Sequence, residues 1–358
     1  MSRAIIAKNI KVKVVDKIIM DAEMGTKYAL MKYIALNIGD VIQSVAAQRF
    51  LPRVDAYVYR ERIDKFSPDS GVKHKVILNN HWMHNPKHFP PSEYVDPLLV
   101  SMSFSRRVRP AISSNKKAVQ YLKDHGPVGC RDTDTVKFLE SCGVPAYQSG
   151  CLTLTLTPNK AIKTSEAGKY VLCVDVSDNI CEYVRKHSSR PVYVMTKQVN
   201  PYPDSMERFT IAKAYLYIYH NAGAVITTNL HTALPCSAFN TPVCLIDHKK
   251  RDGRFDGLDT LTNHCTDTEF LAGAYDVDNP PANPEGYKVF RDSLIETCRN
   301  FTGYDSEMPT FEDSYRPDII ALIQTMADNL DGPRRNMSVR VLMKAIAYRL
   351  THLDKYHE

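Results

Sequence analysis

Residues 28–51 read YALMKYIALNIGDVIQSVAAQRFL, and this stretch decides the fold class. Tyr28 to Leu36 form a mostly apolar run, and a turn follows at Asn37-Ile38-Gly39-Asp40. Val41 to Leu51 then place apolar side chains at helical spacing. The order of strand, glycine turn and helix is typical of α/β proteins, so we expect an α/β fold.

The rest of the chain repeats this alternation of short β-rich runs with longer amphipathic ones. The predicted strands are 75–79, 98–104, 169–176, 191–199 and 224–228, and the predicted helices are 132–142, 205–221 and 233–239. A polar stretch with Pro and Gly at 157–168 suits a linker. We therefore expect an α/β domain over 1–160, a second one over 161–305, and a helical tail over 306–358 that packs on the body. Two such domains bring the carboxyl ends of both sheets to one crevice, where open sheets bind ligands.

The composition favours a soluble, cytoplasmic protein that acts on small molecules. The net charge of +6 over 358 residues fits anionic small substrates better than a nucleic-acid backbone. The start lacks the apolar region of a secretory signal, and no apolar run approaches the roughly 20 residues of a transmembrane helix. Nine cysteines without a C-x-x-C pair indicate reduced thiols rather than a disulfide framework or a zinc site.

The turn around Gly39 is a candidate anion site. Its backbone N–H groups and the dipole of the following helix favour an anionic ligand, with Asn37 and Asp40 beside it. The alternative is that Gly39 only permits the turn while Asp40 caps the helix. The turn lacks the full glycine pattern of a dinucleotide site, which disfavours a nicotinamide enzyme.

A second candidate is Gly129-Cys130-Arg131-Asp132-Thr133, which opens the predicted helix 132–142. Arg131 there can project its guanidinium into the cleft, while Asp132 caps the first turn. The planar guanidinium suits phosphate and carboxylate because it donates two parallel hydrogen bonds. A surface arginine beside a helix cap is the alternative.

A third candidate follows the apolar strand 224–228. Thr228, Asn229, Leu230 and His231 come where this strand ends and the helix 233–239 approaches. His231 can donate to a phosphate or transfer a proton near neutral pH; the alternative is a core histidine with satisfied hydrogen bonds.

The histidine-rich stretch His81-Trp-Met-His84-Asn-Pro-Lys-His88 invites a metal hypothesis. Pro86 makes it a loop without helical i, i+4 pairing, and no supporting cysteine or carboxylate pattern is present. We expect no metal and assign His84 to substrate contact, with loop packing as the alternative. Motifs of α/β-hydrolases and P-loop nucleotide triphosphatases are also missing from the sequence.

Taken together, three short motifs resemble those of the polysaccharide pyruvyl transferases. They are Asn37-Ile-Gly-Asp40 with Gln43-Ser44, then Gly129-Cys-Arg-Asp132, then Asn229-Leu-His231, and their order and their fit to strand ends carry the resemblance. It spans roughly residues 28–250, on the scale of two domains.

The resemblance implies two Rossmann-like domains that face a cleft, in a GT-B-like arrangement. It also implies transfer of the pyruvyl group of phosphoenolpyruvate onto two hydroxyls of a sugar, to form a cyclic ketal with release of phosphate. Phosphoenolpyruvate is then a donor substrate, no cofactor is expected, and a sugar acceptor carried on a lipid is compatible. Arg131 and His231 match the family's donor-binding arginine and histidine.

A working mechanism follows from that assignment. Protonation of the methylene carbon of phosphoenolpyruvate makes its central carbon electrophilic, one hydroxyl adds there, and a second hydroxyl displaces phosphate. We assign His231, Arg131 and Asp40 as catalytic, with Asp40 or Asp132 as the hydroxyl base. The expected substrate-binding residues are Asn37, Gly39, Asp132, Thr228, Asn229, Leu230, Arg254 and His84.

One position departs from the family pattern, because Asn229 replaces the arginine of its Arg-Leu-His motif. Losing a charged hydrogen bond costs about 1.5–3 kcal/mol unless another cation substitutes. The candidate substitutes are Arg254 and Lys213. Two alternative functions stay open: a GT-B-type glycosyltransferase that uses a nucleotide-sugar donor, and a catalytically degenerate carbohydrate-binding relative.

Overall fold

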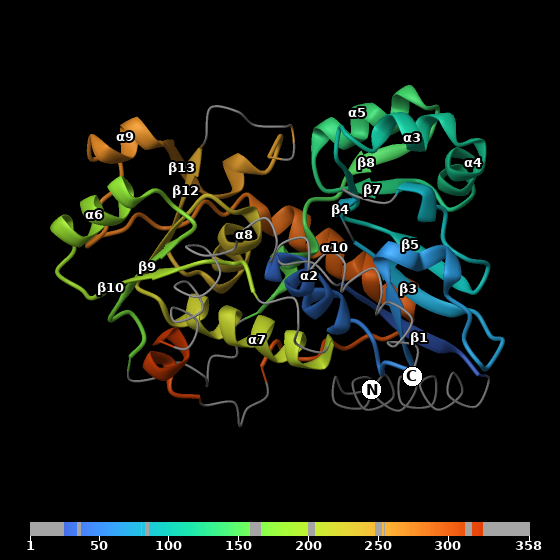
Figure 1. The fold of residues 1–358 in the computed structure, drawn as a ribbon, viewed down its shortest axis with the longest axis horizontal. Helices are drawn as coiled ribbons and strands as arrows, with labels where there is room; N and C mark the ends of the chain where they lie inside the picture. Colours follow the sequence, from blue (N-terminus) through green and yellow to red (C-terminus); the bar gives the residue numbers. More distant parts are fainter. Residues whose placement is uncertain are drawn as a thin grey trace, which may run out of the picture.

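The computed structural model describes residues 25–33, 37–79, 81–82, 86–157, 166–199, 205–247, 253, 255–311 and 317–324. Within them the N-terminal half builds one parallel sheet and the C-terminal half builds another, with helices packed on both (Figure 1). The predicted α/β class is therefore confirmed.

The first sheet has the strand order β2-β1-β3-β5, with all pairs parallel. Its strands are β1 (Lys27–Lys32), β2 (Ala56–Tyr59), β3 (His74–Leu78) and β5 (Val95–Leu99). Two short parallel pairs accompany it, β4 (His81–Trp82) with β6 (Ser103–Phe104) and β7 (Val128–Cys130) with β8 (Ala146–Gln148). The helices of this half are α2 (Ile38–Gln48), α3 (Arg109–Ser114), α4 (Lys116–Asp124) and α5 (Thr133–Ser141), with short 3₁₀ turns η1 (Arg60–Lys65), η2 (Pro86–His88) and η3 (Leu152–Thr155).

The second sheet has the order β10-β9-β11-β12-β13, again with parallel pairs, which is a doubly wound order. Its strands are β9 (Val171–Val174), β10 (Val192–Met195), β11 (Ala224–Thr227), β12 (Val243–Asp247) and β13 (Asn263–Thr266). The helices are α6 (Asp178–His187), α7 (Ser205–Asn221), α8 (Leu230–Phe239), α9 (Asp267–Leu271) and α10 (Tyr287–Thr302), with a 3₁₀ turn η5 (Asp259–Leu261).

Strand β9 shows why this sheet reads as a continuous apolar run. Val171 and Cys173 pack into a small cluster with α6 and α9, whereas Leu172 and Val174 pack into the large core on the other face. Both faces are covered, so every side chain of the strand is buried. Helix α7 contributes Tyr215 to Tyr219 to the large core.

Local turn chemistry shifts several predicted boundaries. Strand β1 ends at Lys32, earlier than the predicted Leu36, and α2 begins at Ile38. The N-cap of α2 is Asn37, whose side chain accepts a hydrogen bond from Gly39 N at 2.9 Å. Asp40 lies in the first turn of α2, so the suggestion that it caps the helix is wrong. The predicted strand 98–104 is interrupted, and Ser101 has a left-handed φ of 54°.

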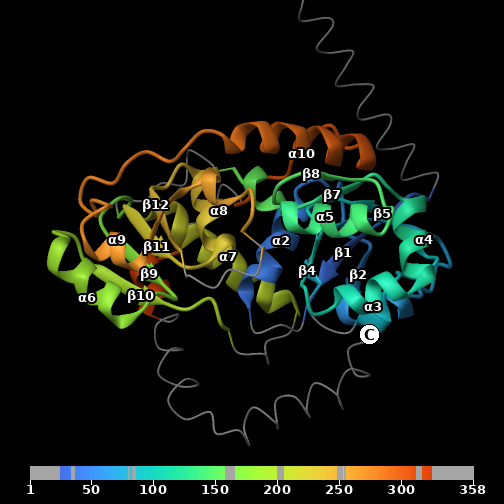
Figure 2. The same ribbon diagram turned by 90° about the horizontal axis from the view of Figure 1, so that it is seen from above.

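Helix α10 connects the two halves. It follows the second sheet in the chain, yet it runs along the side of the molecule toward the first sheet (Figure 2). Tyr28 Oη donates to Thr302 O at 3.1 Å, and Lys75 Nζ donates to Phe301 O at 2.7 Å. Ile319 and Ile323, in the described part of the tail, are also buried in the large core.

Arg49, the C-cap of α2, makes a second connection. Its guanidinium forms an ion pair with Glu307 at 2.6 Å and donates to Thr157 Oγ1, Met308 O and Thr155 O. Burial lowers the pKa of Arg49, and the carboxylate of Glu307 opposes that shift.

Two further properties concern membranes and thiols. Within the described residues, no helix has the length and apolar character needed to cross a membrane. All nine cysteines are free; Cys142 and Cys265 are half-buried and the other seven are buried.

Candidate active site

A cavity of about 110 Å³ lies where the two halves of the chain meet. Its lining residues come from the ends of strands and the starts of helices: Asn37, Asp40, His81, Arg131, Lys197, Thr228, Asn229, Leu230, His231 and Phe255. Each sheet has a topological switch point, where the chain stops adding strands on one side and continues on the other. It lies between β1 and β3 in the first sheet and between β9 and β11 in the second. The segments after β1, β3 and β11 supply lining residues, so the cavity lies at the place where open sheets bind ligands.

Arg131 is central to the cavity and only 3% exposed, so it is not a surface arginine. Its Nη1 lies 3.2 Å from His231 Nε2, and its Nη2 donates to Ser103 Oγ at 3.1 Å. Because a guanidinium has no acceptor, His231 must accept at Nε2 and carry its proton on Nδ1 when neutral. His231 lines the cavity and is half-buried, so it is not a core histidine.

A buried relay lies behind Arg131. Ser103 Oγ donates to Asp132 Oδ2 at 2.6 Å, and His81 Nδ1 lies 2.8 Å from the same hydroxyl. Since the hydroxyl proton goes to Asp132, His81 donates from Nδ1. Asp132 also accepts from Thr135 N at 2.8 Å and caps α5, as predicted. It is 1% exposed and does not line the cavity, so it supports the site without facing a substrate there.

Asp40 enters the cavity from the first turn of α2 and is 5% exposed. Its Oδ2 pairs with Arg60 Nη1 at 3.2 Å, and both side chains are nearly buried. Burial alone lowers the pKa of Arg60, but the carboxylates of Glu61 and Asp40 outweigh it, so that pKa is raised. Arg60 therefore stays a cation and keeps Asp40 paired.

Lys197 brings a cation to the other side of the cavity. Its Nζ donates to Asn229 Oδ1, and Asn229 Nδ2 donates to Asp175 Oδ2 at 3.1 Å. Asp175, which follows β9, also accepts from Lys197 N at 3.2 Å and from Thr196 Oγ1 at 2.6 Å. The Asn229 side chain is thus held by Lys197 and Asp175, and it does not cap α8.

The two halves touch directly at this point. Ile38 N, at the start of α2, donates to Lys197 O at 2.9 Å, and Asn37 forms a β-bridge with Gln198. A Cβ at Gly39 would lie 2.9 Å from both Cβ and Nδ1 of His231. Glycine at 39 therefore lets α2 approach His231, in addition to shaping the turn.

The structure brings most of the predicted site residues together. Asn37, Asp40, Arg131, Thr228, Asn229, Leu230 and His231 line one cavity, with Gly39 against His231 and Asp132 behind Arg131. His84 and Arg254 lie outside the described residues. The suggestion that Lys213 replaces the missing arginine is wrong, because Lys213 lines a different cavity beside Arg49 and Met308.

Sequence reasoning missed His81, Lys197 and Phe255 as lining residues. His81 belongs to the histidine-rich stretch, from which we assigned His84 to substrate contact. No sequence motif marks Lys197 as a lining residue. Its contact with Asn229 depends on β10, β9 and β11 being neighbours in the sheet, which brings their ends together. Across the described residues, no group of three or more His, Cys, Asp or Glu side chains is placed to hold a metal ion.

Parallel sheets with convergent basic and acidic side chains at their switch points define an α/β enzyme site that suits a small anionic substrate. Residues 111–250 match the family model described as polysaccharide pyruvyl transferase, which confirms the resemblance; the chain is a transferase. The match includes Arg131 and Asn229 to His231 but begins after Asn37 to Asp40. No curated protein matches the chain significantly.

Proposed function

We propose that this chain transfers the pyruvyl group of phosphoenolpyruvate onto two hydroxyls of a sugar in a polysaccharide or glycan precursor. The product is a cyclic ketal, and phosphate is released. The observation that carries the proposal is the convergence of Arg131, Lys197 and His231 on one small cavity. The positive groups of Arg131 and Lys197 suit a donor that has both a carboxylate and a phosphate.

Donor binding follows from the charges of the cavity. Arg131 and Lys197 approach it from different halves of the chain, and α8 adds the positive end of its dipole at Leu230 and His231. In this proposal Arg131 binds the phosphate with its planar guanidinium. Lys197, anchored on Asn229, supplies the charge that the family arginine would bring.

Proton transfer is assigned to His231 and Asp40. When the phosphate draws the guanidinium of Arg131 away from His231 Nε2, that nitrogen can carry a proton and deliver it to the methylene carbon. Asp40, paired with Arg60, takes the proton of the first sugar hydroxyl as the hydroxyl oxygen bonds to the central carbon. The second hydroxyl then bonds to that carbon, the bond to the phosphate oxygen breaks, and its proton leaves with phosphate.

The arrangement of the halves is part of the proposal. We infer a GT-B-like pair of Rossmann-like domains over 1–160 and 161–305, with 306–358 as a tail. Support comes from the two switch points on one cavity and the contact of Ile38 with Lys197. A cytoplasmic enzyme that meets an acceptor carried on a lipid fits this picture.

The size of the cavity weighs against the first rival function. A nucleotide-sugar donor needs a site in the range of about 300–1,000 Å³ that larger ligands occupy, whereas this cavity is about 110 Å³. The second rival, a degenerate carbohydrate-binding relative, is disfavoured by Lys197, because the charge that Asn229 lacks is present nearby.

The test is the thermal stability of the full chain with phosphoenolpyruvate, uridine diphosphate or guanosine diphosphate. We expect phosphoenolpyruvate alone to raise the Tm, and Arg131→Ala and His231→Ala to lose that response. Arg131→Lys keeps the charge and folding but loses the bidentate geometry, so it should respond weakly. Arg185→Ala, an exposed arginine on α6, is the matched control. Stabilisation by a nucleotide alone would favour glycosyl transfer, and no response to any of the three would favour a binding protein.

A further inference from the structure

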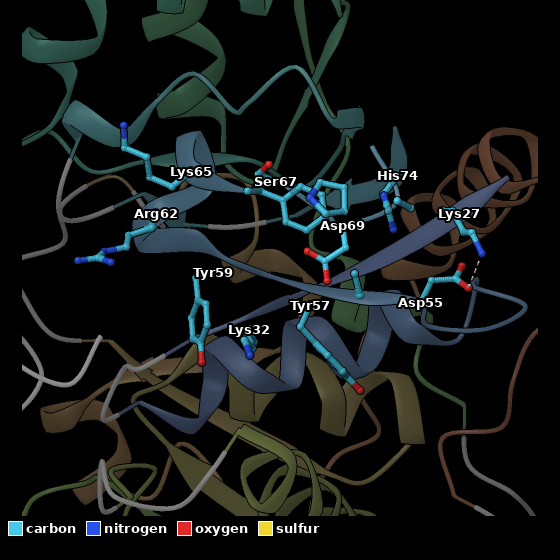
Figure 3. Close-up of a pocket in the computed structure, with 14 residues that line it drawn as sticks. Lys27, Lys32, Asp55, Tyr57, Tyr59, Arg62, Lys65, Ser67, Asp69 and His74 are labelled. Carbon is cyan, nitrogen blue, oxygen red and sulfur yellow. Dashed lines mark ion pairs between the residues drawn. The ribbon is translucent and has the colours of Figure 1, made fainter. Parts of the chain in front are cut away.

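A second and larger cavity lies along the edge of the first sheet. We call it the β2 groove; its volume is about 560 Å³, within the range of ligand sites. It is lined by Lys27, Lys32, Asp55, Ala56, Tyr57, Tyr59, Arg62, Lys65, Phe66, Ser67, Pro68, Asp69, Ser70 and His74. Strand β2 is the edge strand of its sheet and separates two sets of side chains in the groove (Figure 3).

The groove carries more positive than negative charge. Its cations are Lys27, Lys32, Arg62 and Lys65, and its carboxylates are Asp55 and Asp69. Asp55 is paired within the fold, because Arg53 contacts it at 2.9 Å and Lys27 at 3.8 Å, and the exposed Lys65 lies 3.5 Å from Asp64. The lining therefore has four cations against two carboxylates, and this excess of positive charge attracts an anionic ligand.

Aromatic side chains form the other part of the lining. Tyr57 and Tyr59 are two residues apart on β2, so they project from the same face of the strand (Figure 3). The ammonium of Lys32 lies 4.0 Å from the ring centre of Tyr59 and 5.6 Å from that of Tyr57. Burial raises the pKa of Tyr57, so its hydroxyl stays protonated and can donate a hydrogen bond. Tyrosine rings and hydroxyls beside cations suit a molecule with apolar C–H faces, hydroxyls and acidic groups together.

The groove is connected to the candidate active site through consecutive residues. Lys32 and Tyr59 are the last residues of β1 and β2, at the carboxyl edge of the sheet. Arg60, which follows Tyr59, pairs with Asp40 in the cavity of the candidate active site, which we call the donor cavity. The carboxyl end of β2 in the groove is therefore one residue along the chain from Arg60, the partner of Asp40, which is the proposed hydroxyl base.

We propose that the β2 groove binds an acidic segment of the saccharide acceptor, with sugar rings against Tyr57 and Tyr59 and carboxylates paired with Lys32, Arg62 and Lys65. The role as acceptor subsite rests on the proposed function, while the binding of an acidic saccharide stands on the groove itself. The substrate class is then an anionic glycan that contains uronic acids, rather than a neutral one.

The experiment measures binding to the full chain without phosphoenolpyruvate. The probe is a fluorescently labelled hexamer of α-1,4-linked galacturonate, and maltohexaose and hexaglutamate compete with it. We expect the acidic hexasaccharide to bind and to weaken as salt rises, and maltohexaose to compete at least tenfold less well. Arg62→Gln with Lys65→Glu should weaken binding about tenfold, whereas Lys186→Glu, on exposed α6, should not.

A second variant separates saccharide recognition from charge alone. Tyr59→Leu removes the ring and hydroxyl and leaves the cations, so it should weaken the hexasaccharide severalfold and leave hexaglutamate unchanged. Equal binding of hexaglutamate, lost with the charge variants only, would instead indicate an acidic peptide along the β2 edge and overturn the proposal. No binding of the hexasaccharide, or binding that the groove variants do not change, would also overturn it.

The same variants distinguish this proposal from the donor assignment. Groove variants should keep the phosphoenolpyruvate-dependent rise in Tm, because none of them lines the donor cavity. If phosphoenolpyruvate fails to stabilise the wild type while the hexasaccharide binds in the groove, the pyruvyl transfer proposal fails and the saccharide site stands.

Discussion

Lys197 and Asn229 are joined by a side-chain hydrogen bond at the edge of the cavity. Asn229 accepts from Lys197 and donates to Asp175, so the amide orients a cation that comes from another strand end. The sequence identified Asn229 as a departure from the family pattern, but not its partner. The pairing depends on three-dimensional strand order, which residue types and spacing do not encode.

We predict that Lys197→Gln weakens phosphoenolpyruvate binding by roughly ten- to a hundredfold, since a charged hydrogen bond is lost. The readout is the ligand concentration at half-maximal rise in Tm. Lys213→Gln is the control, because it changes a lysine in a different cavity. Adding Asn229→Arg to Lys197→Gln should restore part of the affinity; an unchanged affinity in the single variant would refute the role of Lys197.

A second prediction at this scale concerns acid stability. Burial alone would raise the pKa of Asp134, but hydrogen bonds from Arg109 and Arg106 lower it below 3.8. A depressed folded pKa contributes stability above the unfolded value, and this contribution is lost as pH falls through the folded pKa. Asp134→Asn should therefore reduce the free energy of unfolding by at most about 1 kcal/mol at neutral pH, because solvent still screens these half-buried ion pairs.

Urea unfolding at a series of pH values checks the effect of Asp134→Asn. The difference between variant and wild type should stay constant above pH 5 and shrink as the pH falls below 3.8. A difference that grows toward acid pH would contradict the sign of the shift.

At the scale of elements, the periodicity of apolar residues predicted most of the helices and strands. The residues of the turns set where these elements begin and end. Helix α7 runs over Ser205–Asn221 as predicted, because seventeen residues of helix formers and aromatics have no internal Gly or Pro. The predicted end of strand β1 at Leu36 lies beyond its observed end at Lys32, since an apolar run does not show where a strand ends. The strand-turn-helix unit at Asn37 to Asp40 was recognised correctly, and it supplies two residues of the cavity.

We predict that Gly39→Ala weakens phosphoenolpyruvate binding at least tenfold, as measured by the concentration at half-maximal rise in Tm. The free energy of unfolding should change by less than about 1 kcal/mol. Alanine suits a helix, but its Cβ would press on His231 at 2.9 Å and displace the imidazole. Gly286→Ala is the matched control, because its Cβ would meet only Leu261, at 3.9 Å. A full phosphoenolpyruvate response in Gly39→Ala would show that the approach of α2 to His231 is not needed.

At the scale of the whole molecule, the two halves share one large core and one cavity. The sequence predicted a crevice between carboxyl ends of two sheets, from the alternation of strands and helices. It did not predict that α10 would return to β1 and β3, because those hydrogen bonds link residues more than 200 positions apart.

Glu307 offers a test of how the tail segment fastens the halves together. Glu307→Ala removes the carboxylate that pairs with Arg49 and Arg299, and it leaves the nearly buried Arg49 without its counter-charge. Thr157 and two backbone carbonyls still accept from Arg49, so we expect a loss of about 1.5–3 kcal/mol in the free energy of unfolding. Glu166→Ala, an exposed surface carboxylate, is the control in the same urea titration, and an equal small effect of both would contradict the prediction.

Three buried cysteines, Cys130, Cys236 and Cys298, are protected from alkylating reagents while the chain is folded. Burial raises the pKa of the thiols of Cys130, Cys236 and Cys298, and only a thiolate reacts quickly with iodoacetamide. Each of these thiols reacts only after the structure around it opens locally. The rate of alkylation therefore reports how often that opening occurs. A ligand that binds the folded chain lowers the alkylation rate by the same factor by which it stabilises the folded chain against opening. Labelling of Cys130, next to Arg131, thus gives a donor dissociation constant by mass spectrometry before the acceptor sugar is known.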